Sequence, residues 1–238
     1  MLRTLEVAGI SAQAVWHRES ALPPDIDLVS IPGGFSFGDY LRSGAIAKVS
    51  PIVADIRRHV DRGGLVLGVC NGFQILTECG LLPGALTRNT HLRFESRDIF
   101  VKVVGAGPFT RSLGRDVLRL PIAHADGRFH IDDAGLAALT SASTSDRGAC
   151  VALRYCDAAG NVVADANPNG SLEAIAGIYG GPQRNVLGLM PHPERMSEVI
   201  HGCEDGRLLF DAAIRSIAER SSINAQGRQG IVDLGGSA

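Results

Sequence analysis

Residues 65–74, LVLGVCNGFQ, decide the fold that this chain is expected to adopt. The first five, Leu65–Val69, form an uninterrupted apolar run, which is typical of a parallel strand buried on both faces. Residues 68–72, GVCNG, then have the form of a nucleophile elbow, in which two glycines flank a nucleophilic residue. Residues 71–79 predict a helix. This strand–turn–helix unit predicts an open α/β sheet with Cys70 at the carboxyl edge of a strand.

Cys70 is the candidate nucleophile of this elbow. The amino terminus of the following helix favours the thiolate form of the sulfur. The backbone N–H of Asn71 is expected to face an oxyanion. The alternative interpretation is a buried core cysteine between turn-forming glycines, because free cysteine is among the most buried residue types. The strand–turn–helix context and the flanking glycines favour the nucleophile.

A second motif, Pro191-His192-Pro193-Glu194, follows the apolar segment 185–190. Pro193 favours an extended conformation at His192, and residues two apart in an extended chain point to the same side. Glu194 can therefore orient His192 as a base for a nucleophile. The alternative is a surface turn with a solvated histidine. Because open α/β sheets carry their sites at the carboxyl ends of parallel strands, we expect Cys70, His192 and Glu194 to form a catalytic triad.

A third motif, Pro32-Gly33-Gly34, follows the predicted strand 27–31. Gly33 or Gly34 can present a backbone N–H without side-chain obstruction, as a second oxyanion donor. The alternative is an ordinary tight turn.

Two further polar residues have open interpretations. Gln74 follows Cys70 by one helical turn, and it either contacts a substrate or caps a polar face. His124 follows the predicted strand 117–123, and a place in the site and a structural role are equally compatible with the sequence.

The remaining chain predicts one domain over residues 1–220, an α/β fold with an open, mostly parallel sheet and helices on both faces. Additional β segments are expected in the middle. The predicted strands are 12–16, 27–31, 65–69, 98–104, 117–123, 150–156, 174–179 and 185–190, and the predicted helices are 2–8, 51–62, 71–79, 132–139 and 204–220. Residues 221–238 are rich in polar residues and predict a disordered tail.

Composition narrows the possible partners. The 238 residues are 45% hydrophobic and carry a net charge of −2, which indicates no nucleic-acid or membrane-surface partner. Five cysteines without a CxxC pair indicate neither a disulfide framework nor a metal site. The first residues, MLRTLEVAGI, do not predict a signal peptide, and no apolar run of about 18 residues predicts a spanning helix. A cytoplasmic location is expected.

The order of the three motifs resembles that of class I glutamine amidotransferases, which have a flavodoxin-like fold. Longer words resemble one branch, the glutaminase subunit of phosphoribosylformylglycinamidine synthase. These words are PGGFSFGDYLR at 32–42, GVCNGFQ at 68–74, LLPGALTRN at 81–89, PIAH at 121–124, NPNGS at 167–171 and MPHPER at 190–195. The similarity extends from about Arg3 to Arg215.

The resemblance implies that Cys70 attacks the side-chain amide of glutamine, with an oxyanion held by N–H groups near Gly34 and Asn71. His192, oriented by Glu194, would protonate the departing ammonia, and water would release glutamate. Gln74 would contact the substrate. The resemblance implies no metal or cofactor in this subunit.

The resemblance also implies partners. Ammonia would pass to a synthetase subunit that uses ATP and Mg to convert formylglycinamide ribonucleotide to its amidine, and a small third subunit would bridge the two. The loop 35–42 and the surroundings of His124 would contact glutamine or a partner.

One departure from the family pattern concerns the start of the chain. The family begins with an apolar strand and a Gly-Ser-Asn-Cys-Asp-type loop, which the sequence before residues 2–8 lacks. We therefore expect that Met1 is not the native start and that about 20 residues precede it, the length of a strand–loop–helix unit.

Two other functions remain compatible with the sequence. One is a Cys-elbow hydrolase or chaperone of the DJ-1/PfpI type, although those proteins usually lack the PHPE segment. The other is a catalytically inactive scaffold subunit, which the intact Cys70, His192 and Glu194 disfavour.

Overall fold

The computed structural model describes residues 1–111, 113–141 and 148–229, with side chains as far as Ser222. The strands are β1 (Leu28–Ile31), β2 (Leu65–Val69), β3 (Ala85–Thr87), β4 (Glu95–Val103), β5 (Val117–His124), β6 (Arg128–His130), β7 (Cys150–Cys156), β8 (Ile175–Gly180) and β9 (Val186–Leu189). The α-helices are α1 (Leu2–Val7), α2 (Ile52–Asp61), α3 (Asn71–Glu78), α4 (Asp133–Ser141) and α5 (Arg207–Gln229).

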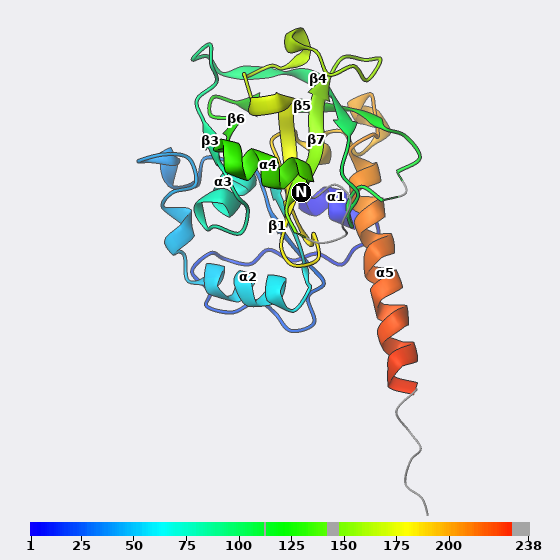
Figure 1. Ribbon diagram of the computed structural model, residues 1–238. Helices are drawn as coiled ribbons and strands as arrows, with labels where there is room; N and C mark the ends of the chain where they lie inside the picture. Colours follow the sequence, from blue (N-terminus) through cyan, green and yellow to red (C-terminus); the bar gives the residue numbers. More distant parts are fainter. Residues whose placement is uncertain (112, 142–147, 230–238) are drawn as a thin grey trace, which may run out of the picture.

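A seven-stranded sheet in the order β1-β2-β9-β8-β7-β4-β5 forms the centre of the molecule (Figure 1). The strands β1, β2 and β9 are parallel, in the register Ser30–Leu67 and Leu67–Leu187. The pairings from β9 through β8, β7 and β4 to β5 are antiparallel. A small second sheet joins β3 to β6.

The α/β class predicted from the sequence is confirmed, and the expected additional β segments join the same sheet. The parallel part is smaller than expected because β8 connects to β9 through the short turn 181–185. A turn of this length joins antiparallel neighbours, whereas parallel neighbours need a long crossover. The parallel pairing is therefore confined to the three strands that precede the three sequence motifs.

The core lies around these parallel strands. Every residue of β2 and β9 is buried, as expected for strands covered on both faces. Helix α3 packs against β1, β2 and β9, and α4 packs against β7.

Two sequence predictions are wrong in the described residues. The segment 12–16 pairs with no described strand and is largely exposed, with Trp16 at 63%. Helix α5 continues through residues 221–229, where a disordered tail was expected (Figure 1). The Ser221 and Ser222 hydroxyls bond to the carbonyls of Ile217 and Ala218, four residues earlier in this helix. Residues 230–238 lie outside the described residues.

Within the described part of the chain, no helix has the length and apolar character needed to cross a membrane.

The two elbow glycines stand where chain segments approach most closely. A Cβ atom on Gly72 would overlap the carbonyl oxygen of Ile31 at the end of β1. A Cβ atom on Gly68 would lie 2.8 Å from the carbonyl carbon of Gly72. Any side chain at these positions would therefore separate β1, β2 and α3.

The substitution Gly72→Ala tests this packing constraint. Because the new Cβ meets backbone, which cannot rotate away, we expect the free energy of unfolding to fall by about 2–4 kcal/mol. Urea unfolding followed by circular dichroism measures the change. Gly80→Ala is the matched control, because Gly80 has a φ of +67° but open space around it, so only about 1 kcal/mol of backbone strain is expected. Equal losses in the two variants would contradict the close approach.

Candidate active site

The three motifs of the sequence meet at the carboxyl ends of β1, β2 and β9. Gly33 follows β1, Cys70 follows β2, and His192 follows β9. A Cβ atom added to Gly33 would lie 2.6 Å from His192 Cε1 and 3.4 Å from Cys70 Cβ. Gly33 thus fills the space between the two side chains, and only a residue without a side chain fits there.

Cys70 has the strained backbone of a nucleophile elbow. Its φ and ψ are 52° and −105°, in a region that residues with side chains rarely occupy. The surroundings hold this conformation: the Cys70 N–H donates to Leu189 O at 2.8 Å, and its carbonyl accepts from Gln74 N at 3.2 Å. The Sγ atom lies 3.7 Å from Ala123 O at the end of β5. Pairing to β9 and the start of α3 therefore fix the direction of the sulfur.

Burial keeps the Cys70 thiol protonated. The residue is 6% exposed, and burial raises the pKa of the thiol to about 12. The backbone N–H of Asn71 and the charge of Arg195 oppose this rise, while the carboxylates of Glu194 and Asp39 add to it. The N–H at the start of α3 acts in the direction predicted from the sequence, but desolvation outweighs it. The thiol therefore needs a base.

His192 and Glu194 form a buried pair. The Nδ1 atom of His192 lies 2.7 Å from Glu194 Oε1, and their side chains are 2% and 12% exposed. The residue Pro193 begins a 3₁₀ turn, Pro193–Arg195, which carries Glu194 back toward the imidazole. The pairing predicted from the sequence is present, although the turn and not an extended chain produces it.

The second nitrogen of His192 is unused. With Nδ1–H donating to Glu194, the lone pair of the imidazole belongs to Nε2 in the tautomer that this bond selects, and Nε2 is buried without a hydrogen-bond partner in the structure. The backbone N–H of His192 donates to Pro121 O at 2.8 Å, which anchors the residue to β5. An oriented imidazole with a free acceptor nitrogen is the arrangement of a general base.

Asn71 and Gln74 are engaged with their neighbours. Asn71 Nδ2 donates to Gln74 Oε1 at 2.8 Å, and Asn71 Oδ1 accepts from Ser36 N at 3.2 Å. Gln74 Nε2 donates to Asp126 O at 2.6 Å. These bonds join α3 to the loop after β1 and to the turn after β5. A substrate contact for Gln74 and oxyanion donation by Asn71 and Gly34 stay predictions.

His124 lies buried beside this cluster. Its Nδ1 is 3.2 Å from Asn89 Oδ1, which also accepts the Gly127 N–H at 3.1 Å. Burial and, to a smaller extent, the nearby His192 lower the pKa of His124 to about 4. His124 is therefore a neutral imidazole. Asn89 fixes the tautomer of His124 by accepting a hydrogen bond from Nδ1. Asn89 was not predicted as a site residue, and the one sequence feature that pointed to it was its position at the end of the family-like segment LLPGALTRN.

The loop after β1 borders the site. Asn71 Nδ2 lies 3.4 Å from Asp39 Oδ1, and Ser43 Oγ donates to Asp126 Oδ2 at 3.0 Å. Burial raises the pKa of Asp39, and the neighbouring charge of Asp126 adds to the rise. The loop therefore places one carboxylate, that of Asp39, close enough to act on the Cys70 thiol.

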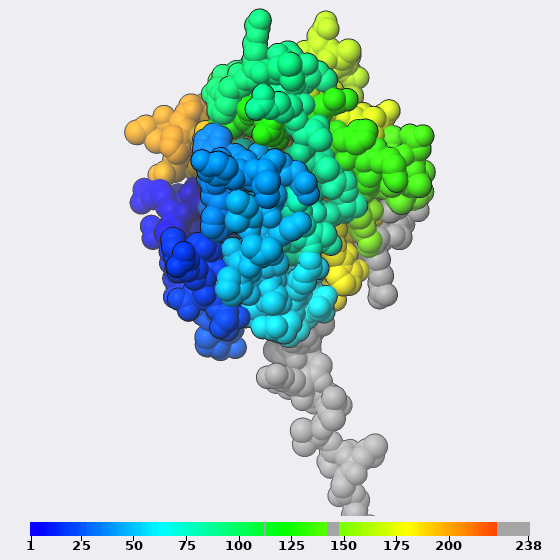
Figure 2. All heavy atoms as spheres, turned by 90° about the vertical axis from the view of Figure 1, so that its left-hand side faces the viewer, coloured from blue at the N-terminus to red at the C-terminus, as the bar shows by residue number. Residues whose placement is uncertain are grey.

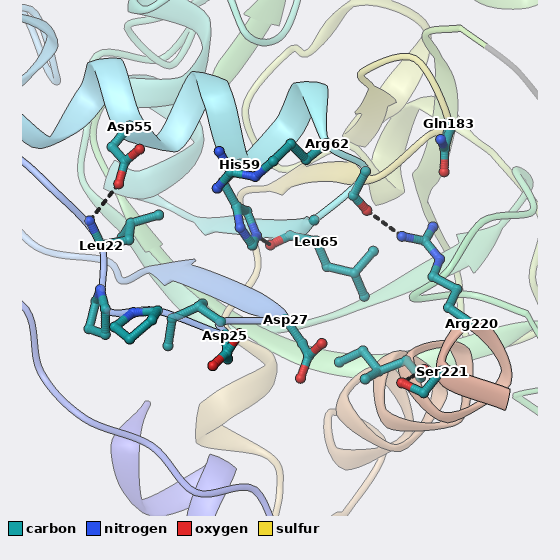
Figure 3. Close-up of a pocket in the computed structure, with 16 residues that line it drawn as sticks. Leu22, Asp25, Asp27, Asp55, His59, Arg62, Leu65, Gln183, Arg220 and Ser221 are labelled. Carbon is teal, nitrogen blue, oxygen red and sulfur yellow. Dashed lines mark hydrogen bonds between the residues drawn. The ribbon is translucent and has the colours of Figure 1, made fainter. Parts of the chain in front are cut away.

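A separate cavity of about 620 Å³ lies at the opposite, amino-terminal ends of the strands (Figure 3). It is lined by Asp27, Asp55, His59, Arg62 and Arg220, among others, and by none of the motif residues. In the close-up, Asp55 bonds to the Leu22 N–H and Arg220 to the Gly63 carbonyl, so part of this lining is already engaged. Across the described residues, no three His, Cys, Asp or Glu side chains are grouped to hold a metal ion.

Comparison with known proteins gives consistent matches. The model of the CobB/CobQ-like glutamine amidotransferase domain matches residues 1–203. Phosphoribosylformylglycinamidine synthase subunit PurQ of Rhodospirillum rubrum is 53% identical over 89% of this chain and 90% of that protein. The same subunit of Methanosarcina mazei is 48% identical over 90% of both chains. A chain in the structure of PurLQS from Thermotoga maritima has a TM-score of 0.74 and 37% identity, covering 90% of both chains.

The protonation state of Cys70 can be tested by alkylation. Because burial raises its pKa to about 12, we expect the iodoacetamide rate constant to rise about tenfold per pH unit from pH 7 to 10. Peptide mass spectrometry at Cys70 measures it, in a Cys203→Ser background that removes the half-exposed thiol. Cys70→Ala gives the blank. A rate constant that levels off below pH 8 would show a thiolate at rest.

Proposed function

The chain belongs to the CobB/CobQ-like glutamine amidotransferase family, and we propose that Cys70, His192 and Glu194 carry out its reaction. It is the glutamine amidotransferase subunit of phosphoribosylformylglycinamidine synthase, an enzyme of purine biosynthesis. The DJ-1/PfpI type is therefore set aside, because the family match covers the chain from residue 1 to residue 203.

One observation carries the triad proposal. Cys70 sits in a strained elbow, and a glycine separates it from an imidazole whose other nitrogen is bonded to a carboxylate at 2.7 Å. Nucleophile, base and orienting group are thus in one buried cluster, as nucleophilic catalysis requires. The same observation disfavours an inactive scaffold, since a subunit without catalysis has no need of strain at Cys70.

The reaction begins with proton transfer. When glutamine binds, His192 Nε2 takes the proton of the Cys70 thiol, and the sulfur attacks the side-chain carbonyl carbon. The carbonyl oxygen becomes an oxyanion, held by backbone N–H groups near Gly34 and Asn71. The imidazolium then gives its proton to the amide nitrogen, the C–N bond breaks, and ammonia leaves. A thioester remains on Cys70.

Hydrolysis of the thioester completes the cycle. His192, neutral again, takes a proton from water, and the resulting hydroxide attacks the thioester carbon. The C–S bond breaks, the sulfur recovers the proton, and glutamate departs. Glu194 stabilises the imidazolium that forms in both halves, which is the role of the carboxylate in such triads.

The ammonia is delivered to partner subunits in this proposal. A synthetase subunit, using ATP and Mg, would consume it in converting formylglycinamide ribonucleotide to the amidine, and a small subunit would bridge the two. The relative from Thermotoga maritima belongs to PurLQS, which supports this assembly. The subunit itself would need no cofactor, and it would act in the cytoplasm.

The loop 35–42 is the proposed docking surface for the synthetase. It carries exposed apolar side chains, with Phe35 at 68%, Tyr40 at 75% and Leu41 at 92%. The loop forms part of the surface in Figure 2, where it is coloured medium blue. Because Ser36 and Asp39 of the same loop contact Asn71, a partner bound here would act directly on the site.

The triad is tested with glutamate release by the chain together with its synthetase partners. We expect Cys70→Ala to abolish the release and Glu194→Gln to lower kcat about a hundredfold, because a base and its orienting group are lost. Both variants should retain synthesis driven by added ammonium chloride, which shows that the complex is intact. Full glutamine-dependent activity in Cys70→Ala would refute the proposal.

The docking surface is tested by Leu41→Asp. We expect this charge in an apolar interface to weaken the complex at least about tenfold, because the carboxylate loses its hydration on binding. Analytical ultracentrifugation with the synthetase measures the dissociation constant. Val162→Asp is the matched control, an exposed apolar residue on the turn after β7. An unchanged constant for Leu41→Asp would exclude this loop from the interface.

A further inference from the structure

The backbone carbonyl of Glu194 is held by two buried hydroxyl groups. Thr4 Oγ1, from α1, donates to Glu194 O at 3.1 Å, and Ser197 Oγ also donates to it at 3.1 Å. The two hydroxyl oxygens lie 3.2 Å apart. Thr4 is 4% exposed and Ser197 is 1% exposed. Two residues that lie 193 positions apart in the chain thus meet at one atom of the His–Glu turn.

The proton count makes the two hydroxyls partly redundant. Each hydroxyl has one proton to donate, so two protons serve the three oxygen–oxygen contacts. If both hydroxyls donate to the carbonyl, it receives two hydrogen bonds. If one hydroxyl donates to the other, the second still donates to the carbonyl. Glu194 O is therefore always held by at least one hydroxyl.

The carboxylate of Glu194 has little else to hold it. Oε1 is bonded to His192 Nδ1, while Oε2 is buried without a hydrogen-bond partner, and Arg195 Nε approaches Oε1 only to 3.8 Å. The position of the carboxylate therefore depends on its own backbone. That backbone belongs to a 3₁₀ turn of three residues, Pro193–Arg195, which has few internal bonds.

We propose that Thr4 and Ser197 are positioning residues, which keep Glu194 at hydrogen-bonding distance from His192. The inference rests on the triad of the proposed function. It assigns to the first helix of the chain a part in catalysis, although Thr4 touches neither Cys70 nor His192. The role belongs to the hydroxyl groups, because they bind the Glu194 carbonyl. Any shift of that carbonyl moves the Glu194 carboxylate with it.

A second contact between α1 and the same segment supplies a control. Arg3 forms an ion pair with Glu198 at 3.1 Å, and the Arg3 side chain is 72% exposed. This pair joins the same two segments at the surface but does not touch Glu194. Arg3→Ala therefore loosens the docking of α1 without altering the hydroxyl pair, and it separates docking from positioning.

The test measures kcat and KM for glutamine with the synthetase partners present, in Thr4→Val, Ser197→Ala and the double variant. We expect each single variant to lower kcat about threefold and the double variant about thirtyfold or more, because misplacing a catalytic group by about 1 Å costs up to about a hundredfold. The loss in the double variant should exceed the product of the single losses. KM should stay unchanged, since glutamine is not contacted. Thr4→Ser, which keeps the hydroxyl group, should have the kcat of the unmodified chain, and so should Arg3→Ala.

Other outcomes overturn the proposal. Unchanged kcat in the double variant, or an equal loss in Arg3→Ala, would reduce the hydroxyls to a structural contact. If the double variant shows no thermal unfolding transition and is therefore not folded, the kcat values of Thr4→Val and Thr4→Ser are compared instead. Equal values in these two variants would refute the positioning role. Glu194→Gln distinguishes a failure of this inference from a failure of the triad. If Glu194→Gln retains full kcat, the triad itself is refuted. If Glu194→Gln loses kcat while the Thr4 and Ser197 variants keep it, only the positioning role is refuted.

Discussion

The site depends on close packing around three glycines. Gly68 and Gly72 let α3 start directly against β1 and β2, and Gly33 lets the imidazole of His192 and the side chain of Cys70 share one space. Interiors are close-packed, so a methyl group at Gly68 or Gly72 must displace backbone, and one at Gly33 must displace the His192 imidazole. The strained conformation of Cys70 is held by this packing and by its pairing to β9.

Burial gives the cluster its chemical character. The thiol is kept neutral and the His192–Glu194 bond is shielded from water, which strengthens it. A neutral thiol is a poor target for oxidants and alkylating agents, because the thiolate is the reactive form. In the proposed mechanism, the thiol is thus protected until a substrate arrives, and the free Nε2 of His192 then takes its proton.

The sequence predicted the parallel half of the fold well, because its signals there are local. Adjacent residues alone were enough to recognise the apolar run of β2, the two elbow glycines and the PHPE turn. The segment 12–16 failed because strand formation needs a partner, which a local pattern does not reveal. The roles of Thr4, Ser197 and Asn89 were invisible, since each depends on a contact between residues far apart in the chain. The extension of α5 was missed because polar composition was taken as disorder, although helix bonds are made within the segment itself.

The pairing of β2 with β9 has a consequence for the order in which the molecule is built. These neighbouring strands are separated in the sequence by the whole antiparallel part of the sheet. A ribosome therefore releases the elbow long before the strand that holds it, and contacts of such long range form slowly. Until β9 arrives, nothing pairs with the Cys70 N–H, and the nascent elbow is free to relax. The proposed active site is therefore among the last parts of this protein to form.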